Sequence, residues 1–286
     1  MTALKRVGVV GCGLMGSGIV QVSAAAGIDT IVREVDQPTL DKGLGRIKKF
    51  LEDGVAKGKV TAEDKDKTLA HIRGTTKLED LAPCELIVEA AIENIAAKRE
   101  VFGTLDKITK PDQVLASNTS SLSITEIAAS TSHPERVLGL HFFNPVPLMK
   151  LVEIIRVLPT NDAAFDRAKG YVEQIGKTAV ICKDTPGFVV NRLLVPYLLD
   201  AVRLLESGLA TREDIDNGMK LGCGYPMGPL TLLDFVGLDT TYYIANIMYD
   251  EFRQPHFAPP PLLKRMVLAG YMGRKSGRGF YEYAKS

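Results

Sequence analysis

The sequence predicts an α/β domain with a doubly wound parallel sheet, followed by an all-helical domain. Strand-like apolar runs alternate with helical patterns up to about residue 183, an order typical of a parallel sheet covered by helices. From residue 188 onward the patterns are helical, apart from a candidate terminal strand over 279–283. Proline and glycine in Asp184–Gly187 interrupt both patterns. We therefore expect an α/β domain over residues 1–184 and an all-α domain over residues 185–286.

The first predicted strand runs directly into a glycine-rich turn. Val7–Val10 is an apolar run typical of a strand buried on both faces, and Gly11, Gly13 and Gly16 follow it in a G-x-G-x-x-G pattern. In nucleotide-binding folds the first glycine permits a tight turn, the second lets a pyrophosphate approach the backbone, and the third lets the next helix pack on the strand. The N-terminus of that helix would offer free N–H groups to a phosphate.

A second strand completes this unit and carries an acidic residue. The first helix is expected to end at Gly27, and the next strand is expected over 29–35, with Glu34 near its end. An acid about 20 residues past the glycines can accept a hydrogen bond from a ribose 2′-hydroxyl. The order strand, turn, helix, strand and acid predicts a Rossmann-type dinucleotide site, with contacts at Gly11, Gly13, Leu14, Met15, Gly16 and Glu34.

The remaining elements follow from similar patterns. A polar, lysine-rich stretch over 39–71 is longer than a crossover helix needs, and a solvated helical hairpin explains it without any ligand. Ser123 and Glu126 form a capping box that predicts the start of a short helix. Other strands are expected at 86–91, 114–118, 137–142, 151–157 and 178–182, and other helices at 96–108, 162–175, 188–207, 211–221, 229–250 and 260–270.

The composition excludes several classes of protein. The chain has 286 residues, 45% of them hydrophobic, and a formal net charge of +1, so its charge gives no reason to expect nucleic acid or an acidic membrane surface as a partner. No apolar run reaches the roughly 18 residues of a membrane span. The first strand begins near Lys5, which leaves no room for a signal peptide. The four cysteines have no metal-binding spacing, so we expect no metal site, reduced thiols and a cytoplasmic location.

Polar residues at the carboxyl ends of predicted strands are the first candidates for chemistry, because ligands of open α/β sheets bind beyond these ends. One pair lies at and after the end of the strand over 114–118, a second lies at and after the strand over 137–142, and a third follows the strand over 86–91. The candidates are Asn118, Ser120, His141, Asn144, Glu93 and Asn94.

His141 has a candidate partner in the next strand. Glu153 lies as far after Pro147 as His141 lies before it, so an antiparallel hairpin about this turn would bring the two side chains opposite each other. Glu153 also interrupts the apolar run Leu151–Ile155, where an unpaired carboxylate would cost several kcal/mol. A carboxylate that fixes one histidine tautomer produces a general base near neutral pH. A lone histidine in an apolar strand is nevertheless commonly a structural, hydrogen-bonded residue.

Ser120 and Asn191 also allow two interpretations. Serine-rich turns commonly cap helices, but the capping box already uses Ser123, which leaves the Ser120 hydroxyl available. Asn191 lies in the first turn of an apolar helix, where its amide could either satisfy helix-end backbone groups or face a ligand.

Nearly the whole chain resembles the (S)-3-hydroxyacyl-CoA dehydrogenase family, and most closely its bacterial members that act on four-carbon substrates. The resemblance is carried by several motifs that occur in the same order. They are Val9-Val-Gly-Cys-Gly-Leu-Met-Gly16, Glu89-Ala-Ala-Ile-Glu-Asn94, Ser117-Asn-Thr-Ser-Ser121, Gly139-Leu-His-Phe-Phe-Asn-Pro-Val-Pro147, Pro186-Gly-Phe-Val-Val-Asn-Arg192 and Gly277-Arg-Gly-Phe-Tyr281.

This resemblance implies an NAD-dependent enzyme that interconverts 3-hydroxyacyl-CoA and 3-oxoacyl-CoA. It implies that His141 is the catalytic base and Glu153 its orienting partner, that Ser120 and Asn191 contact the substrate's oxygen and acyl region, and that Asn144 lies between cofactor and substrate. Further NAD contacts are implied at Glu34, Glu93, Lys98, Asn118, Ser120 and Lys275, and CoA phosphate contacts at Lys57 and Lys49.

Two further expectations follow from the family. Its members are dimeric through the C-terminal helical domain, so we expect a homodimer here. They usually carry aspartate where this chain has Glu34, and the adjacent Arg33 leaves some use of NADP open.

Two other functions fit parts of the sequence. A 3-hydroxy-acid dehydrogenase of the 6-phosphogluconate type has the same two-domain plan, but it uses a lysine base from the helical domain, whereas this chain offers His141 and Glu153. A non-catalytic NAD-binding protein would share the fold, and the presence of His141, Glu153, Ser120 and Asn191 argues against it.

Overall fold

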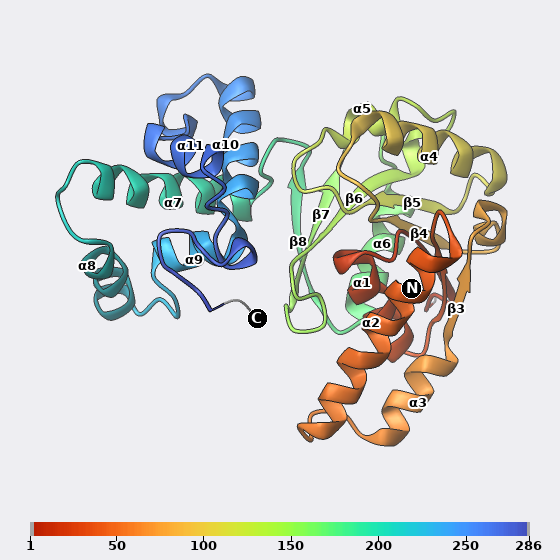
Figure 1. Cartoon of the computed structure of the whole chain (residues 1–286). Helices are drawn as coiled ribbons and strands as arrows, with labels where there is room; N and C mark the ends of the chain where they lie inside the picture. The colour runs from red at the N-terminus through yellow and green to blue at the C-terminus, as the bar shows by residue number, and fades with distance from the viewer. Residues whose placement is uncertain (1–2, 285–286) are drawn as a thin grey trace. The chain divides into compact units, whose positions relative to one another are not determined.

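The computed structural model describes residues 3–284, which divide into two compact units (Figure 1). The first unit ends at Thr185 and the second begins at Pro186, one residue after the boundary expected from the sequence. The first unit is an α/β structure, and the second is helical throughout its described residues.

The first unit is built on one eight-stranded sheet with the strand order β3-β2-β1-β4-β5-β6-β7-β8. The strands are β1 (Arg6–Val10), β2 (Asp29–Arg33), β3 (Ile72–Thr75), β4 (Leu86–Glu89), β5 (Val114–Ser117), β6 (Val137–Phe142), β7 (Leu151–Arg156) and β8 (Thr178–Lys183). Strands β1 to β6 are mutually parallel, β7 is antiparallel to β6, and β8 is parallel to β7. The chain reverses its direction of winding between β1 and β4, which is the point where doubly wound sheets bind ligands.

Helices cover both faces of the sheet. The helices of this unit are α1 (Leu14–Ala25), α2 (Gln37–Ala56), α3 (Ala62–Ala70), α4 (Ile95–Ile108), α5 (Ile124–Ala128) and α6 (Asp162–Gln174). Apolar residues of α1, α2 and α6 share one core with alternate residues of the strands, such as Leu138 and Leu140. The intervening Gly139 points to the other face, because a Cβ there would meet Ile124 of α5. His141 has the same parity as Gly139 and therefore lies on the α5 face.

The lysine-rich stretch is a helical hairpin, as predicted. Helices α2 and α3 extend away from the sheet (Figure 1). Asp36 caps the N-terminus of α2, where its side chain accepts a hydrogen bond from the Thr39 N–H. Only four residues of α2 are buried, namely Leu40, Gly43, Ile47 and Leu51. The rest of its surface is solvated, which explains the polar composition.

The second unit packs its helices around an apolar core of its own. Its helices are α7 (Val190–Glu206), α8 (Arg212–Asn217), α9 (Pro229–Val236), α10 (Leu238–Phe252) and α11 (Pro261–Leu268). Leu199, Leu233 and Met248 from three of these helices are fully buried in that core. No helix among the described residues is long and apolar enough to cross a membrane.

Several predicted elements of the second unit are wrong in detail. The helix expected over 229–250 is two helices, because Gly237 adopts a φ of 106° between α9 and α10. The helix expected over 211–221 ends at Asn217 and continues as a short π-helical turn. The terminal strand expected over 279–283 does not form: within residues 3–284 this segment has only isolated bridges, which join Arg278 to Gly273 and to Glu282.

Candidate active site

The glycine loop between β1 and α1 has the geometry that the sequence predicts. Gly11 has a φ of +95°, and a Cβ on it would lie 2.7 Å from the carbonyl oxygen of Ala90. A Cβ on Gly16 would overlap the carbonyl oxygen of Gly11, whereas a Cβ on Gly13 would meet no atom within 4 Å. Backbone packing therefore requires the first and third glycines, and the open side of Gly13 leaves space for a phosphate.

A cavity of about 680 Å³ adjoins this loop. Its walls come from the loop, the end of β2 and the first half of α4, and they are mainly apolar with a few charged groups. This size and lining fit the adenosine half of a dinucleotide. Five of the six predicted cofactor contacts in this region line it: Gly11, Gly13, Leu14, Met15 and Glu34.

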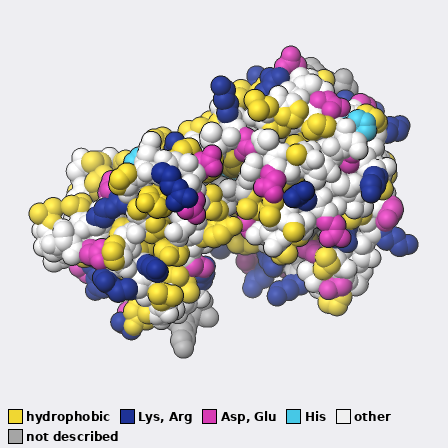
Figure 2. Space-filling model, turned by 90° about the horizontal axis from the view of Figure 1, so that it is seen from above, with side chains coloured by type: hydrophobic (Ala, Val, Ile, Leu, Met, Phe, Trp, Pro, Cys, Tyr) yellow, Lys and Arg dark blue, Asp and Glu magenta, His cyan; other side chains and the backbone are white. Residues whose placement is uncertain are grey.

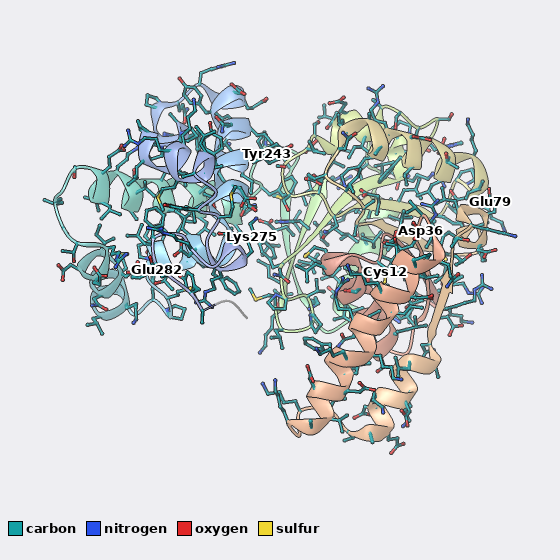
Figure 3. All side chains as sticks on the ribbon, in the orientation of Figure 1. Cys12, Asp36, Glu79, Tyr243, Lys275 and Glu282 are labelled. Carbon is teal, nitrogen blue, oxygen red and sulfur yellow. The ribbon has the colours of Figure 1, made fainter. Side chains whose placement is uncertain are left out.

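Glu34 follows β2 and turns its carboxylate toward the glycine loop. Its Oε1 accepts a hydrogen bond from the Cys12 N–H at 2.5 Å, and its Oε2 accepts one from the Val35 N–H at 3.1 Å. Cys12 lies beside α1 and α2 (Figure 3), and burial raises the pKa of its thiol to about 11, which keeps it protonated at neutral pH. The neighbouring Arg33 also lines the cavity, where its Nε donates to the Thr76 carbonyl at 3.3 Å.

The predicted hairpin of β6 and β7 is confirmed, and His141 pairs with Glu153 across it. The Nδ1 atom of His141 lies 2.6 Å from Oε2 of Glu153. Their side chains are 5% and 0% exposed, so this ion-pairing geometry is shielded from solvent. A carboxylate accepts hydrogen bonds, so this contact favours a proton on Nδ1 and, in the neutral imidazole, a lone pair on Nε2. That is the tautomer that a general base needs.

Ser120 stands on the other side of the imidazole. Its Oγ lies 3.0 Å from Nε2 of His141, and the capping role in this turn belongs to Ser123, whose side chain accepts from the Glu126 N–H. A hydroxyl and an imidazole nitrogen that meet in this way can both contact one oxygen atom of a ligand. Phe143 lies against the imidazole, with 4.5 Å between the ring centroids.

Glu93 and Lys98 join the end of β4 and the start of α4 to the Ser120 turn. Lys98 is buried, and its Nζ lies 2.7 and 3.0 Å from the carboxylate oxygens of Glu89 and 3.3 Å from Oε2 of Glu93. The other oxygen of Glu93 accepts from Thr119 Oγ1 at 2.5 Å and from the Ser120 N–H at 3.3 Å. Glu93 is the exposed member of this group, with 36% of its side chain accessible.

Asn118 and Asn144 lie near the carboxyl ends of β5 and β6. Asn118 is buried, and its Oδ1 accepts from the Phe142 N–H at 2.9 Å. Asn144 is exposed in the turn after β6, where it precedes a cis peptide bond to Pro145. Lys177 holds this turn, because its Nζ donates to the carbonyl oxygens of Val146 and Met149 at 2.7 and 2.5 Å.

The remaining predicted residues belong to the second unit or to the α2–α3 hairpin. Asn191 is half-buried in the first turn of α7. Lys275 belongs to the same unit (Figure 3), and its Nζ lies 2.6 Å from Oδ1 and 2.7 Å from Oδ2 of Asp239. Lys49 and Lys57 are exposed on the α2–α3 hairpin, Lys49 in the second half of α2 and Lys57 directly after its end. Basic and acidic side chains are interspersed over the face drawn in Figure 2, in keeping with the low net charge.

Sequence reasoning missed three residues that shape this site. Glu89 and Ser117 were assigned only to strands, yet Ser117 Oγ donates to Glu89 Oε2 at 2.8 Å beneath Lys98. A carboxylate at the end of a buried apolar strand was the available signal for Glu89. Lys177 gave no such signal, because its contacts depend on how the β6–β7 turn folds back beside β8.

Comparison with known proteins gives matches over nearly the whole chain. Residues 6–185 match the family described as 3-hydroxyacyl-CoA dehydrogenase, NAD binding domain, and residues 187–283 match its C-terminal domain. A 3-hydroxybutyryl-CoA dehydrogenase of Mycobacterium tuberculosis is 53% identical over 98% of this chain and 99% of its own length. The mitochondrial hydroxyacyl-coenzyme A dehydrogenase of Mus musculus is 46% identical over 98% of this chain and 91% of its own. The crystal structure of (S)-3-hydroxybutyryl-CoA dehydrogenase from Ralstonia eutropha superposes with a TM-score of 0.96, at 43% identity, over 99% of this chain and 100% of its own.

Proposed function

The chain belongs to the 3-hydroxyacyl-CoA dehydrogenase family, and on this premise we propose that it is an NAD-dependent dehydrogenase that interconverts (S)-3-hydroxybutyryl-CoA and acetoacetyl-CoA. Relatives that carry the name 3-hydroxybutyryl-CoA dehydrogenase are 45–53% identical over almost the full length. The observation that carries the proposal is the buried chain of contacts from Glu153 through His141 to Ser120.

His141 is the general base of the proposed reaction. In the oxidative direction its Nε2 takes the proton of the 3-hydroxyl group while the C3–H bond breaks and its electron pair leaves as hydride. NAD, when bound, supplies the acceptor for that hydride. Glu153 stabilises the imidazolium that forms, and it does so without reorganisation because its carboxylate already contacts Nδ1 at 2.6 Å. In the reductive direction the imidazolium returns the proton to the carbonyl oxygen.

Ser120 and Asn191 are proposed to bind the substrate. The Ser120 hydroxyl lies beside Nε2, so an oxygen of the substrate that contacts both groups from one side would receive a hydrogen bond from Ser120 and face the base. Asn191 and Asn144 are proposed for the acyl and nicotinamide sides, as the family resemblance implies. Lys57 and Lys49 are proposed for the CoA phosphates, since both ammonium groups are exposed on a solvated helical hairpin.

The residues around the glycine loop fit NAD. The open side of Gly13 admits a pyrophosphate, and Glu34 offers a carboxylate to a ribose hydroxyl at the edge of an adenosine-sized cavity. Glu93, Lys98, Asn118, Asn144 and Lys275 complete the proposed set of cofactor contacts. Within the described part of the chain, the hydrogen bonds and ion pairs of the Lys98 ammonium are to carboxylate oxygens. We therefore assign the direct contact with the cofactor to the exposed Glu93 and an indirect one to Lys98.

Two further properties of the molecule are proposed. We propose a homodimer formed through the second unit, which exposes large apolar side chains such as Leu193, Leu221 and Leu268. We also propose a cytoplasmic location. Sedimentation of the purified protein tests the first proposal, and cell fractionation tests the second.

An absorbance assay tests the activity. The purified protein, mixed with acetoacetyl-CoA and NADH, is expected to consume NADH with a one-to-one yield of 3-hydroxybutyryl-CoA of the S configuration, and a His141→Ala control is expected to be inactive. A folded parent protein that binds NADH but does not turn over acetoacetyl-CoA would instead indicate a non-catalytic NAD-binding protein. Turnover of a free 3-hydroxy acid without CoA would favour the 6-phosphogluconate type.

A further inference from the structure

Glu89 lies close to the proposed site and is a fully buried carboxylate, with no exposed surface. It is the last residue of β4 and lies opposite Ser117 of β5. Its oxygens accept hydrogen bonds from the Ala91 N–H at 2.7 Å, from Ser117 Oγ at 2.8 Å and from Lys98 Nζ at 2.7 and 3.0 Å. With no exposed surface, Glu89 can contact neither substrate nor cofactor directly.

Lys98 links this buried carboxylate to the surface. Only 2% of its side chain is exposed, and a buried ammonium is stable only when paired and hydrogen-bonded. An ammonium has three N–H donors, and three carboxylate oxygens lie around Nζ, two from Glu89 and one from Glu93. Glu89 therefore fixes the position of the Lys98 ammonium, and the ammonium fixes Glu93.

Glu93 in turn holds the turn that carries Ser120. Its Oε1 accepts from Thr119 Oγ1, the Ser120 N–H and Ser121 Oγ at 2.5, 3.3 and 3.3 Å. The same turn places Ser120 Oγ 3.0 Å from His141 Nε2. A continuous series of charged and hydrogen-bonded groups thus runs from Glu89 to the proposed base.

We propose that Glu89 is a positioning residue for both cofactor and substrate, which acts through Lys98 on Glu93 and the Ser120 turn. This inference rests on the proposed function, in which Glu93 contacts NAD and Ser120 contacts the 3-oxygen. The group of Glu89, Lys98 and Glu93 carries one excess negative charge. Neutralising Glu89 removes the charge from two of the three oxygen acceptors around the Lys98 ammonium. The ammonium is then expected to shift toward Glu93, which weakens the hydrogen bonds of Glu93 to the Ser120 turn.

Glu89→Gln tests the proposal, because the amide keeps the shape and removes the charge. We expect kcat/KM for the acetoacetyl-CoA and NADH reaction to fall about 10- to 100-fold. This is the decrease in rate that corresponds to the interaction energies typical of residues in one hydrogen-bond network. The Kd for NADH, measured by fluorescence without acyl-CoA, is expected to rise in the same variant. Glu85→Gln is the matched control, since Glu85 lies directly before the same strand and its carboxylate accepts hydrogen bonds from the backbone N–H groups of Lys5 and Arg6. The kcat/KM and the Kd for NADH of this variant are expected to stay within about twofold of the parent values.

A double-mutant cycle separates positioning from a merely structural role. If Glu89 acts through Lys98, then Glu89→Gln added to Lys98→Met costs no further activity or NADH affinity, and the double variant melts higher than Lys98→Met because it no longer buries an unpaired charge. A structural role predicts that the double variant recovers activity together with stability.

Three results would overturn the proposal: a folded Glu89→Gln protein whose NADH affinity and kcat/KM lie within about twofold of the parent, independent losses that multiply in the double variant, or recovery of activity in that variant. Failure of the proposed function has a different signature. In that case the parent protein itself does not turn over acetoacetyl-CoA, and the NADH affinities of the four proteins still decide the role of Glu89.

Discussion

Replacing Glu153 by glutamine is the sharpest test of the proposed acid–base pair. The amide has nearly the volume of the carboxylate and fits the same position on β7 opposite His141, but it carries no charge. It can also present its N–H group to Nδ1 of His141, which lies 2.6 Å from the carboxylate in the parent protein. That contact favours the tautomer in which Nε2 bears the proton and cannot act as a base.

The size of the effect follows from the charge that develops on the imidazole. In the transition state the ring gains a positive charge, whose centre lies about 4 Å from the charge of the carboxylate; at an effective dielectric constant of about 20 this attraction is about 4 kcal/mol. Such a loss corresponds to a decrease in kcat of roughly 10³-fold. In Ser-His-Asp triads the equivalent change costs about 10⁴-fold, so we expect kcat to fall by roughly 10²- to 10⁴-fold.

The assay measures kcat per folded active site. Circular dichroism and NADH binding give the folded fraction, and initial rates of oxidation of (S)-3-hydroxybutyryl-CoA by NAD give kcat and KM. KM for 3-hydroxybutyryl-CoA should change little, because in this direction the charge on His141 develops only as the proton is transferred. His141→Ala should be at least as damaging, and the double variant no worse than the worse single variant, since the two residues act as one unit. A folded Glu153→Gln protein with kcat within about threefold of the parent would refute the pair.

Four further outcomes are expected. The enzyme should prefer NADH to NADPH, because Glu34 would face the 2′-phosphate with a like charge; an equal or higher kcat/KM with NADPH would contradict this. Acetoacetyl-CoA should be the best 3-oxoacyl substrate in a series from four to ten carbons, and a kcat/KM that rises with chain length would contradict the four-carbon assignment. Lys177→Met should lower the free energy of unfolding in urea by about 1 kcal/mol, because two carbonyl groups lose a charged donor that water partly replaces, while Lys169→Met, which removes only an exposed i,i+4 pair, should change it by less than about 0.5 kcal/mol. Burial alone would raise the pKa of Asp106, but hydrogen bonds from Arg136 and the Ser132 N–H hold it below its usual value; its ionised form therefore stabilises the fold above about pH 4, and the difference in Tm between parent and Asp106→Asn should shrink as pH falls from 4 toward 2.

The elements that the sequence predicts well are those whose signal is local. Val7–Val10 is an apolar run with glycines after it, and the resulting strand, turn and helix are all present. The strand β3 escaped prediction because Ile72–Thr75 has one apolar residue, one glycine and a half-exposed position at the edge of the sheet. The break at Gly237 also escaped, because a glycine within a helical pattern does not by itself reveal a positive φ.

Within the candidate site, some contacts could be predicted from the spacing of residues along the sequence, whereas others depend on how distant elements pack in the fold. The symmetric placement of His141 and Glu153 about a turn was enough to predict their pairing. The contact of Lys98 with Glu89 joins the first turn of a helix to the end of a strand nine residues earlier, and its existence follows from the angle at which α4 returns to the sheet. Ser120 was predicted as available, but its distance to His141 depends on how β5 and β6 lie side by side.

The reversal of strand direction between β6 and β7 has a consequence for how the protein folds. Parallel neighbours in this sheet can meet only after a crossover has formed, so their contacts close long loops at a high entropic cost. His141 and Glu153 are twelve residues apart in the chain and meet when a single turn closes, which is a microsecond event in isolated hairpins. The two groups that exchange and stabilise the proton are thus brought together by one of the most local strand pairings of the sheet, and closing that pairing requires no crossover.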